Sequence, residues 1–352
     1  MFLVIAAALV IVLAGLRDIG SLLGPVFLAL TLAVAARPTG HWLRARGVPR
    51  WLSTVLVLVL LYVVLVGMLA ALALAVTQLV GVLPDYAAQF TNLWQGVLGW
   101  LADHGIHEDA ITRATREVNV GTVVGVAQGV LSSLTSGATG ALFLLLSVAF
   151  LVIDTAGIEA RVKRVRAARP QLAAAVEDFT GRVRRYWLYS ALFGLVLAAA
   201  DYVALLLLGV PLALTWAVVA FICNFVPNVG FVLALIPPAI LGLLIGGPWL
   251  GLGVVAAYVG VSFVVQTLLL PKFMGDAVGL NTTTTFLSLV FWASIIGGLG
   301  ALLAIPLTLF VKAIIIDSTP SLRWLNAFIS TEDENAKAAR RRDDAEQAAA
   351  SP

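Results

Sequence analysis

The sequence predicts an all-α, polytopic membrane protein with about eight hydrophobic segments. Hydrophobic residues make up 61% of the 352 residues, charged residues only 12%, and the mean hydropathy is +1.02. An average soluble domain is about 25% charged and about 45–50% apolar. This chain therefore lacks the polar residues needed to cover a water-facing surface, and the soluble enzyme folds are excluded.

The first part of the chain predicts three membrane crossings. Two apolar stretches, 1–16 and 19–36, together form an expected transmembrane hairpin at 1–36. The first stretch has no basic region before it, so we interpret it as a helix and not as a cleaved signal. A basic loop is expected at 37–51. The apolar run at 52–83 is longer than the roughly 20 residues that cross a bilayer, and it predicts one long transmembrane helix.

The middle of the chain predicts amphipathic and charged regions around a single crossing. In residues 84–140, apolar side chains recur at helical spacing between polar ones, which is typical of helices that lie on a membrane. Residues 141–153 are apolar and predict the next transmembrane helix. The charged stretch at 154–186 predicts a basic helix outside the bilayer.

Lysine and arginine counts predict the orientation. The segments 37–50 and 155–185 hold four and eight basic residues, whereas 84–140 holds only two. Because basic loops stay on the cytoplasmic side, we expect both basic segments and both termini to be cytoplasmic and 84–140 to be extracytoplasmic. The net charge of +3 thus reports orientation and does not indicate a nucleic-acid partner.

The C-terminal half contains two apolar stretches that do not fit a single crossing. Residues 212–246 are interrupted at 224–230, and residues 284–316 are interrupted at 297–300. Their second halves carry prolines Pro237, Pro238 and Pro306. Non-helical backbone is tolerated at membrane depth only inside protein or beside a wet cavity.

Paired interruptions of this kind are a pointer to a transporter's binding site. We therefore predict two inverted, Gly/Pro-interrupted hairpins within a transport core at 187–316, and a disordered cytoplasmic tail at 317–352. The alternative is that each stretch is one long, kinked helix, which gives eight conventional spans. The core consists, in order, of a span at 187–208, the interrupted hairpin 212–246, a span at 250–270 and the interrupted hairpin 284–316.

The motifs at these interruptions resemble the autoinducer-2 exporter family of bacterial membrane permeases. The matching elements are Phe225-Val226-Pro227-Asn228-Val229-Gly230, Gln266, Pro271-Lys272-Phe273-Met274-Gly275-Asp276, Val278-Gly279-Leu280, Gly297-Gly298-Leu299-Gly300 and Ala304-Ile305-Pro306-Leu307. The order of segments agrees across nearly the whole chain. Family members often have an acidic residue after the glutamine, where this chain has Thr267. The resemblance implies a multi-pass protein of the bacterial cytoplasmic (inner) membrane that transports a solute.

Polar residues at membrane depth are the candidate substrate-path residues. Asp201 lies inside an apolar span, where a carboxylate is costly and usually functional. It is the candidate ion-coupling residue; the alternative is an acid near the interface that is bonded to Tyr202 or to a neighbouring helix. Asn224, Asn228 and Gln266 either bind a hydroxylated solute or satisfy backbone groups at the break.

Further candidates supply the broken backbone and the gates. Pro227, Gly230, Gln266, Gly297, Gly298 and Gly300 complete the predicted substrate path, and Pro271, Lys272, Gly275 and Pro306 form a predicted gate and interface. Lys272 has the alternative role of an interfacial lysine that reaches the headgroups. Asn281 is expected either to cap the following helix or, with Thr282–Thr285, to coordinate a cation.

The expected function is export of a small polar solute, an autoinducer-2-like signal molecule or another metabolite, by secondary active transport or facilitated diffusion. The alternatives are a monovalent cation/proton antiporter and a non-transporting scaffold. A nucleotide-binding GxxxxGK[ST] motif and the HExxH and GxSxG motifs are absent from the sequence. We therefore expect no enzymatic activity, no cofactor and no metal. The expected partners are the solute or ion, anionic lipid at the basic cytoplasmic loops and further copies of the chain.

Overall fold

The computed structural model describes residues 11, 13–86, 138–154, 158–227, 229–269 and 279–331, and isolated positions between 88 and 132. Within these ranges the chain is helical, and its only β-type pairing is an isolated bridge between Leu280 and Ser330. The predicted all-α class is therefore confirmed.

Four of the described helices are long and apolar enough to cross a membrane. They are α2 (Gly20–Ala45), α3 (Arg50–Val82), α9 (Pro170–Leu207) and the run Gly230–Thr267. That run comprises the whole of α11 (Gly230–Ser262) and most of the π-helical turn that follows it. Shorter apolar helices are Gly140–Asp154 within α7 (Ala138–Asp154), α10 (Ala213–Cys223) and α13 (Thr282–Ile296).

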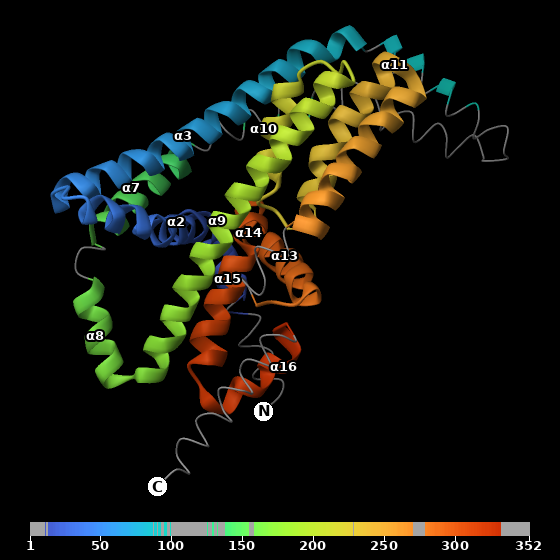
Figure 1. The fold of residues 1–352 in the computed structure, drawn as a ribbon. Coiled ribbons are helices and arrows are strands. Elements are labelled where there is room, and N and C mark those ends of the chain that lie inside the picture. The colour runs from blue at the N-terminus through green and yellow to red at the C-terminus, as the bar shows by residue number, and fades with distance from the viewer. Residues whose placement is uncertain are drawn as a thin grey trace.

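Helices α2 and α7 pack together with the N-terminal part of α3, whose other end reaches α10 (Figure 1). Small residues on α2 allow close approach, and the Ser53 hydroxyl on α3 donates a 3.0 Å hydrogen bond to the carbonyl oxygen of Gly40. The Tyr62 hydroxyl donates to the Leu145 carbonyl at 2.8 Å, which joins α3 to α7. The core of this group consists of Ala29, Ala33, Ala36, Val57, Leu61, Val148 and Val152.

The predicted basic loop at 37–51 is mostly helical. Helix α2 continues to Ala45, and α3 begins at Arg50, so only a short turn with Gly47 at φ 86° separates them. The helix continues because Gly40 still packs against Ser53 and Val57 of α3, while Arg37 and Arg44 stay partly exposed and Arg46 is exposed.

The sequence predicts a basic helix at 154–186 and a separate span at 187–208, but the boundary between the two helices lies earlier in the structure. A short helix α8 (Ile158–Ala168) ends at Ala168. After Arg169, α9 runs without a break for 38 residues from Pro170. Proline suits the first helical position, where its missing N–H removes no hydrogen bond.

The helices break at both predicted interruptions, and the helices on the two sides of each break pack against each other; these breaks are called the helix reversals below. Helices α10 and α11 pack against each other on either side of residues 224–229, and α13 packs against α14 (Gly298–Leu302) and α15 (Ala304–Val311). A Cβ at Gly230 would overlap the carbonyl oxygen of Cys223, and one at Gly300 would overlap that of Trp292. Only glycine permits approaches this close.

Helix α11 is itself divided at Gly247, whose φ of 71° and ψ of −165° are not helical. The break falls at the short connection that the sequence predicts between 246 and 250. The second part of α11 ends in a π-helical turn, η3 (Phe263–Leu269). Figure 1 shows α10 and α11 beside the C-terminal part of α9, with α13, α14 and α15 nearer its middle.

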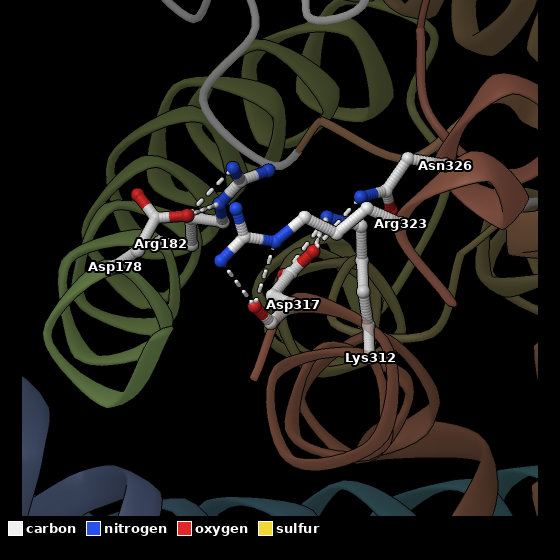
Figure 2. Close-up of polar contacts among 6 residues, drawn as sticks. All are labelled: Asp178, Arg182, Lys312, Asp317, Arg323 and Asn326. Atoms are coloured by element: carbon white, nitrogen blue, oxygen red, sulfur yellow. Dashed lines mark hydrogen bonds and ion pairs between the residues drawn. The ribbon is translucent and has the colours of Figure 1, made fainter. Parts of the chain in front are cut away.

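Residues 317–331, predicted to belong to a disordered tail, are ordered. A π-helical turn, η4 (Lys312–Asp317), leads to a 3-10 helix at Pro320–Leu325, η5, and to α16 (Asn326–Ile329). Lys312 is 3% exposed and pairs with Asp317 at 3.1 Å. Figure 2 shows Asp317 between Lys312, Arg323 and Asn326, with the Asp178–Arg182 pair of α9 nearby. These contacts hold the segment against the helices.

The same C-terminal segment contacts the start of α13. The backbone N–H of Asn281 donates to the Ile329 carbonyl at 3.0 Å, and its side-chain amide donates to the Phe328 carbonyl at 2.6 Å. The Asn281 side-chain oxygen accepts from the backbone N–H of Thr284 at 2.8 Å. The expected helix cap is therefore confirmed, and its second contact fixes residues 326–330.

Candidate functional site

A cavity of about 520 Å³ lies where the first helix reversal meets α9 and the end of α11. Three predicted residues line it: Asn224 and Pro227 from the reversal, and Gln266 from the π-helical turn. Ile305 of α15 also lines it, so the second hairpin contributes to the wall. The remaining lining residues are Tyr186, Tyr189, Ser190, Phe193, Leu197, Val226, Phe231, Val259, Ser262, Phe263 and Thr267.

A smaller cavity of about 20 Å³ adjoins the first one and brings in two more predicted residues, Asp201 and Gly230. The two cavities share Leu197, Asn224, Phe231, Ser262 and Gln266. Five of the predicted site residues thus surround one continuous region: Asp201, Asn224, Pro227, Gly230 and Gln266.

Asp201 is the most deeply buried carboxylate of the described chain, with 3% of its surface exposed. Its Oδ1 has no hydrogen-bond partner among the described residues, and neither has the Tyr258 hydroxyl, which lines the same small cavity. The expected alternative, a bond from Tyr202 to this oxygen, is not formed. Burying such groups without partners costs several kcal/mol, so the small cavity favours a species that supplies the missing bonds.

Asn224 has a positioning role as well as a place in the cavity wall. Its side-chain amide donates to the carbonyl oxygen of Ser190 on α9 at 2.9 Å, and Gly194 leaves the room for this contact. The Tyr186 hydroxyl donates to the Phe225 carbonyl at 3.0 Å. These two bonds satisfy polar groups at the reversal and fix it to α9.

Gln266 lies on the π-helical turn and is exposed. Such turns within α-helices occur frequently at functional sites. Because Gln266 lines both cavities, its amide is available to a molecule in either of them.

The predicted residues of the second interruption lie outside the two cavities. Gly297, with φ 72°, and Gly298 form the reversal, Gly300 packs on Trp292, and Pro306 is buried. The reversal contacts α2 at Gly24, where an added Cβ would lie 2.9 Å from the Ile296 side chain. The Trp292 Nε1 donates to the Thr308 hydroxyl at 3.0 Å and joins the two arms.

The two reversals nevertheless meet. Val226 of the first packs against a core cluster that contains Leu303, Ala304 and Ile305 of the second hairpin.

Four further candidates, Asn228, Pro271, Lys272 and Gly275, lie outside the described residues.

Two lining residues, Tyr258 and Ser262, were missed by the sequence interpretation, although their spacing carries a signal. With the predicted Gln266 they recur every fourth residue, which places all three on one face of a helix. Tyr186, Ser190, Leu197 and Asp201 on α9 follow a similar spacing. The buried Lys312 was also missed, although it is the only charged residue between Asn281 and Ile316.

Comparisons with known proteins agree on one family. The family model described as AI-2E family transporter matches residues 1–319. The protein named "AI-2 transport protein TqsA" from Escherichia coli (strain K12) is 30% identical over 305 residues, which is 86% of this chain and 88% of that protein. "Putative transport protein YhhT" from the same strain is 30% identical over 310 residues, 87% of each chain. The chain therefore belongs to the AI-2E transporter family, and it is a membrane transporter.

Proposed function

We propose that a small polar solute crosses the membrane through the two adjoining cavities. The observation that carries this proposal is the convergence of Asp201, Asn224 and Gln266 around them from three separate elements. Amides and hydroxyls bind hydroxylated solutes by hydrogen bonds. A volume of about 520 Å³ is within the range of about 300–1,000 Å³ found for small-molecule sites.

The cavity chemistry favours a hydroxylated metabolite. The polar side chains besides the tyrosines are Ser190, Asn224, Ser262, Gln266 and Thr267, and the aromatic wall consists of Tyr186, Tyr189, Phe193, Phe231 and Phe263. Apart from Asp201 in the small cavity, no charged side chain lines this region among the described residues. An autoinducer-2-like signal molecule fits this chemistry and agrees with the name of the relative TqsA. The proposed direction is export.

The two helix reversals are the proposed moving parts. In our proposal, the hairpins α10–α11 and α13–α15 enter the membrane from opposite sides and meet at the cavity, and rocking of one against the other opens it alternately. The contact between Val226 and the cluster around Ile305 supports this arrangement. The proposed topology places both termini in the cytoplasm, and the proposed assembly is a homo-oligomer.

A second candidate function is monovalent cation/proton antiport. The observation that favours it is the pair of unpartnered oxygens of Asp201 and Tyr258 in the small cavity. A carboxylate oxygen and a phenol oxygen provide hard ligands for a cation, and the carboxylate also accepts a proton. Ion-coupled export of a solute would use both cavities together.

Flux in proteoliposomes distinguishes these functions. Purified protein is reconstituted, and uptake of a panel of hydroxylated solutes is measured with a sodium gradient, a pH gradient or neither. Solute flux that the gradients accelerate supports secondary active export, and gradient-independent flux supports facilitated diffusion. Sodium-dependent proton movement without solute supports antiport. If none of these activities exceeds that of empty liposomes, the proposal fails and a scaffold function is favoured.

A further inference from the structure

A basic pocket lies between the C-terminal end of α2 and the N-terminal end of α3, far along the chain from the transport cavities. Its volume is about 50 Å³. Four side chains that carry or can carry positive charge line it: Arg37, His41 and Arg44 from α2, and Arg50 from α3. None of its described lining residues is acidic; the others are Ala33, Ala36, Gly40, Ser53, Thr54, Val57 and Val152.

The pocket is held in shape by hydrogen bonds to one carbonyl group. The Gly40 carbonyl oxygen accepts from the Ser53 hydroxyl at 3.0 Å and from the Arg44 Nε at 3.1 Å. The first bond fixes α3 against α2, and the second fixes the direction of the Arg44 side chain. It uses one of the five N–H donors of the guanidinium. The arginine is therefore preorganised for a ligand that accepts several hydrogen bonds.

Exposed tryptophans mark the depth of this pocket in the membrane. Trp42 is 51% exposed and Trp51 is 69% exposed, and these residues lie next to pocket residues His41 and Arg50. Tryptophan is enriched at the level of the lipid headgroups. The Arg46 guanidinium stacks 3.7 Å from the Trp42 ring centre, an arrangement that keeps another cation at the same level.

We propose that this pocket binds a phosphate group, and that the group belongs to an anionic phospholipid. Arginine matches phosphate with a planar fork of donors. Three arginines and no acidic residue are among the described residues that line the pocket, so its charge is complementary to an anion. The first backbone N–H groups of α3 have no partners within the helix and add positive potential at its start. This proposal does not depend on which solute the protein transports.

The bound lipid acts as a bridge between α2 and α3. Its phosphate contacts arginines of both helices, so the lipid stabilises the turn that joins them. The acyl chains extend along α3, which is only slightly buried over its apolar part. Binding is therefore expected to stabilise this helical group without entering the transport cavities.

The test compares two double variants of the purified, full-length protein. Arg37→Gln/Arg44→Gln removes two pocket charges, and Lys163→Gln/Arg164→Gln removes two charges from α8 as a matched control. Each protein is placed in nanodiscs with phosphatidylglycerol or phosphatidylcholine, and the bound lipid is counted by native mass spectrometry. Because the pocket variant loses charge-assisted hydrogen bonds to the phosphate that the control variant keeps, it should retain phosphatidylglycerol roughly thirty-fold more weakly. The control variant should retain it like the unaltered protein.

Two further measurements distinguish the lipid from a free phosphate and provide a test if the glutamine variant does not fold. Inorganic phosphate is titrated against the unaltered protein: competition only at millimolar concentrations supports the lipid as the ligand, whereas tight competition overturns the lipid and assigns a free phosphate. If the glutamine variant does not fold, Arg37→Lys/Arg44→Lys and a fluorophore on Ala45→Cys, both in a Cys223→Ser background, report on the same pocket. A fluorescence change with phosphatidylglycerol and none with phosphatidylcholine supports the proposal. Equal responses to the two lipids, or equal lipid retention by the pocket and control variants, would overturn it.

Discussion

The side-chain amide of Asn224 donates a 2.9 Å hydrogen bond to the backbone carbonyl of Ser190. This bond joins the first helix reversal to α9 at the place where the two cavities meet. The broken helix is therefore fixed at one point, and the same residue is in the wall that a solute would contact. Structural and solute-binding interpretations of Asn224 are thus compatible.

Replacing Asn224 by alanine is expected to reduce transport more than stability. Loss of the bond to Ser190 should lower the free energy of unfolding by about 1 kcal/mol. Loss of the solute contact should reduce initial flux in proteoliposomes by about tenfold. Thr215→Val is the matched control, because Thr215 bonds to Gln78 outside the cavities. Similar losses of flux in both variants would show that stability alone explains the effect.

Asp201→Asn is expected to abolish coupling while leaving the protein folded. The amide has the same shape, but it neither carries the charge nor takes up the proton that ion coupling requires. Flux should then no longer respond to a sodium or pH gradient. Asp178→Asn, which alters a half-exposed carboxylate on the same helix, should leave the response intact. Normal gradient-driven proton movement by the Asp201 variant would refute its coupling role.

The helix reversals are expected to tolerate only glycine at two positions. Gly230→Ala and Gly300→Ala each place a methyl group on a backbone carbonyl oxygen. Each should lower the free energy of unfolding in mixed micelles by about 3 kcal/mol. Gly260→Ala has open space and should instead stabilise α11 by about 0.5–1 kcal/mol. Equal effects of all three substitutions would contradict the close packing of the reversals.

The buried ion pair of Lys312 and Asp317 is expected to fix the C-terminal segment. Asp317→Asn leaves the ammonium buried without its carboxylate and should cost about 3 kcal/mol of unfolding free energy. Adding Lys312→Met should recover most of the lost unfolding free energy, because the buried ammonium is then removed as well. Breaking the exposed Arg166–Glu177 pair with Arg166→Gln should change the free energy of unfolding very little. A loss that Lys312→Met does not restore would mean that the ion pair is not the cause.

The fold was predictable where local chemistry decides it. Composition predicted the helical membrane class, and the Gly- and Pro-rich interruptions predicted where the helices break. Helix ends were less predictable, because the arginines at 37–50 indicated a loop while small residues such as Gly40 continued to pack in a helix. The order of residues 317–331 depends on Lys312, Asp317 and Asn281, whose partners are brought close only by the fold.

The candidate site was predictable in its parts but not in its assembly. Asp201, Asn224 and Gln266 stand out as polar residues in apolar surroundings. Their convergence depends on how α9, the first reversal and η3 pack, which no single segment encodes. The regular spacing of Tyr258, Ser262 and Gln266 was the missed signal, because it places Tyr258 on the helix face that meets Asp201.

Blocking the large cavity tests the central claim most directly. In a Cys223→Ser background, Gln266→Cys is labelled with a bulky thiol reagent, and solute flux into proteoliposomes is measured. The control is a labelled Leu195→Cys variant, because Leu195 is 62% exposed on α9 and lies outside this cavity. Labelling at position 266 is expected to stop flux, and labelling at position 195 is expected to leave it unchanged. Undiminished flux through the protein labelled at position 266 would contradict a solute path through this cavity.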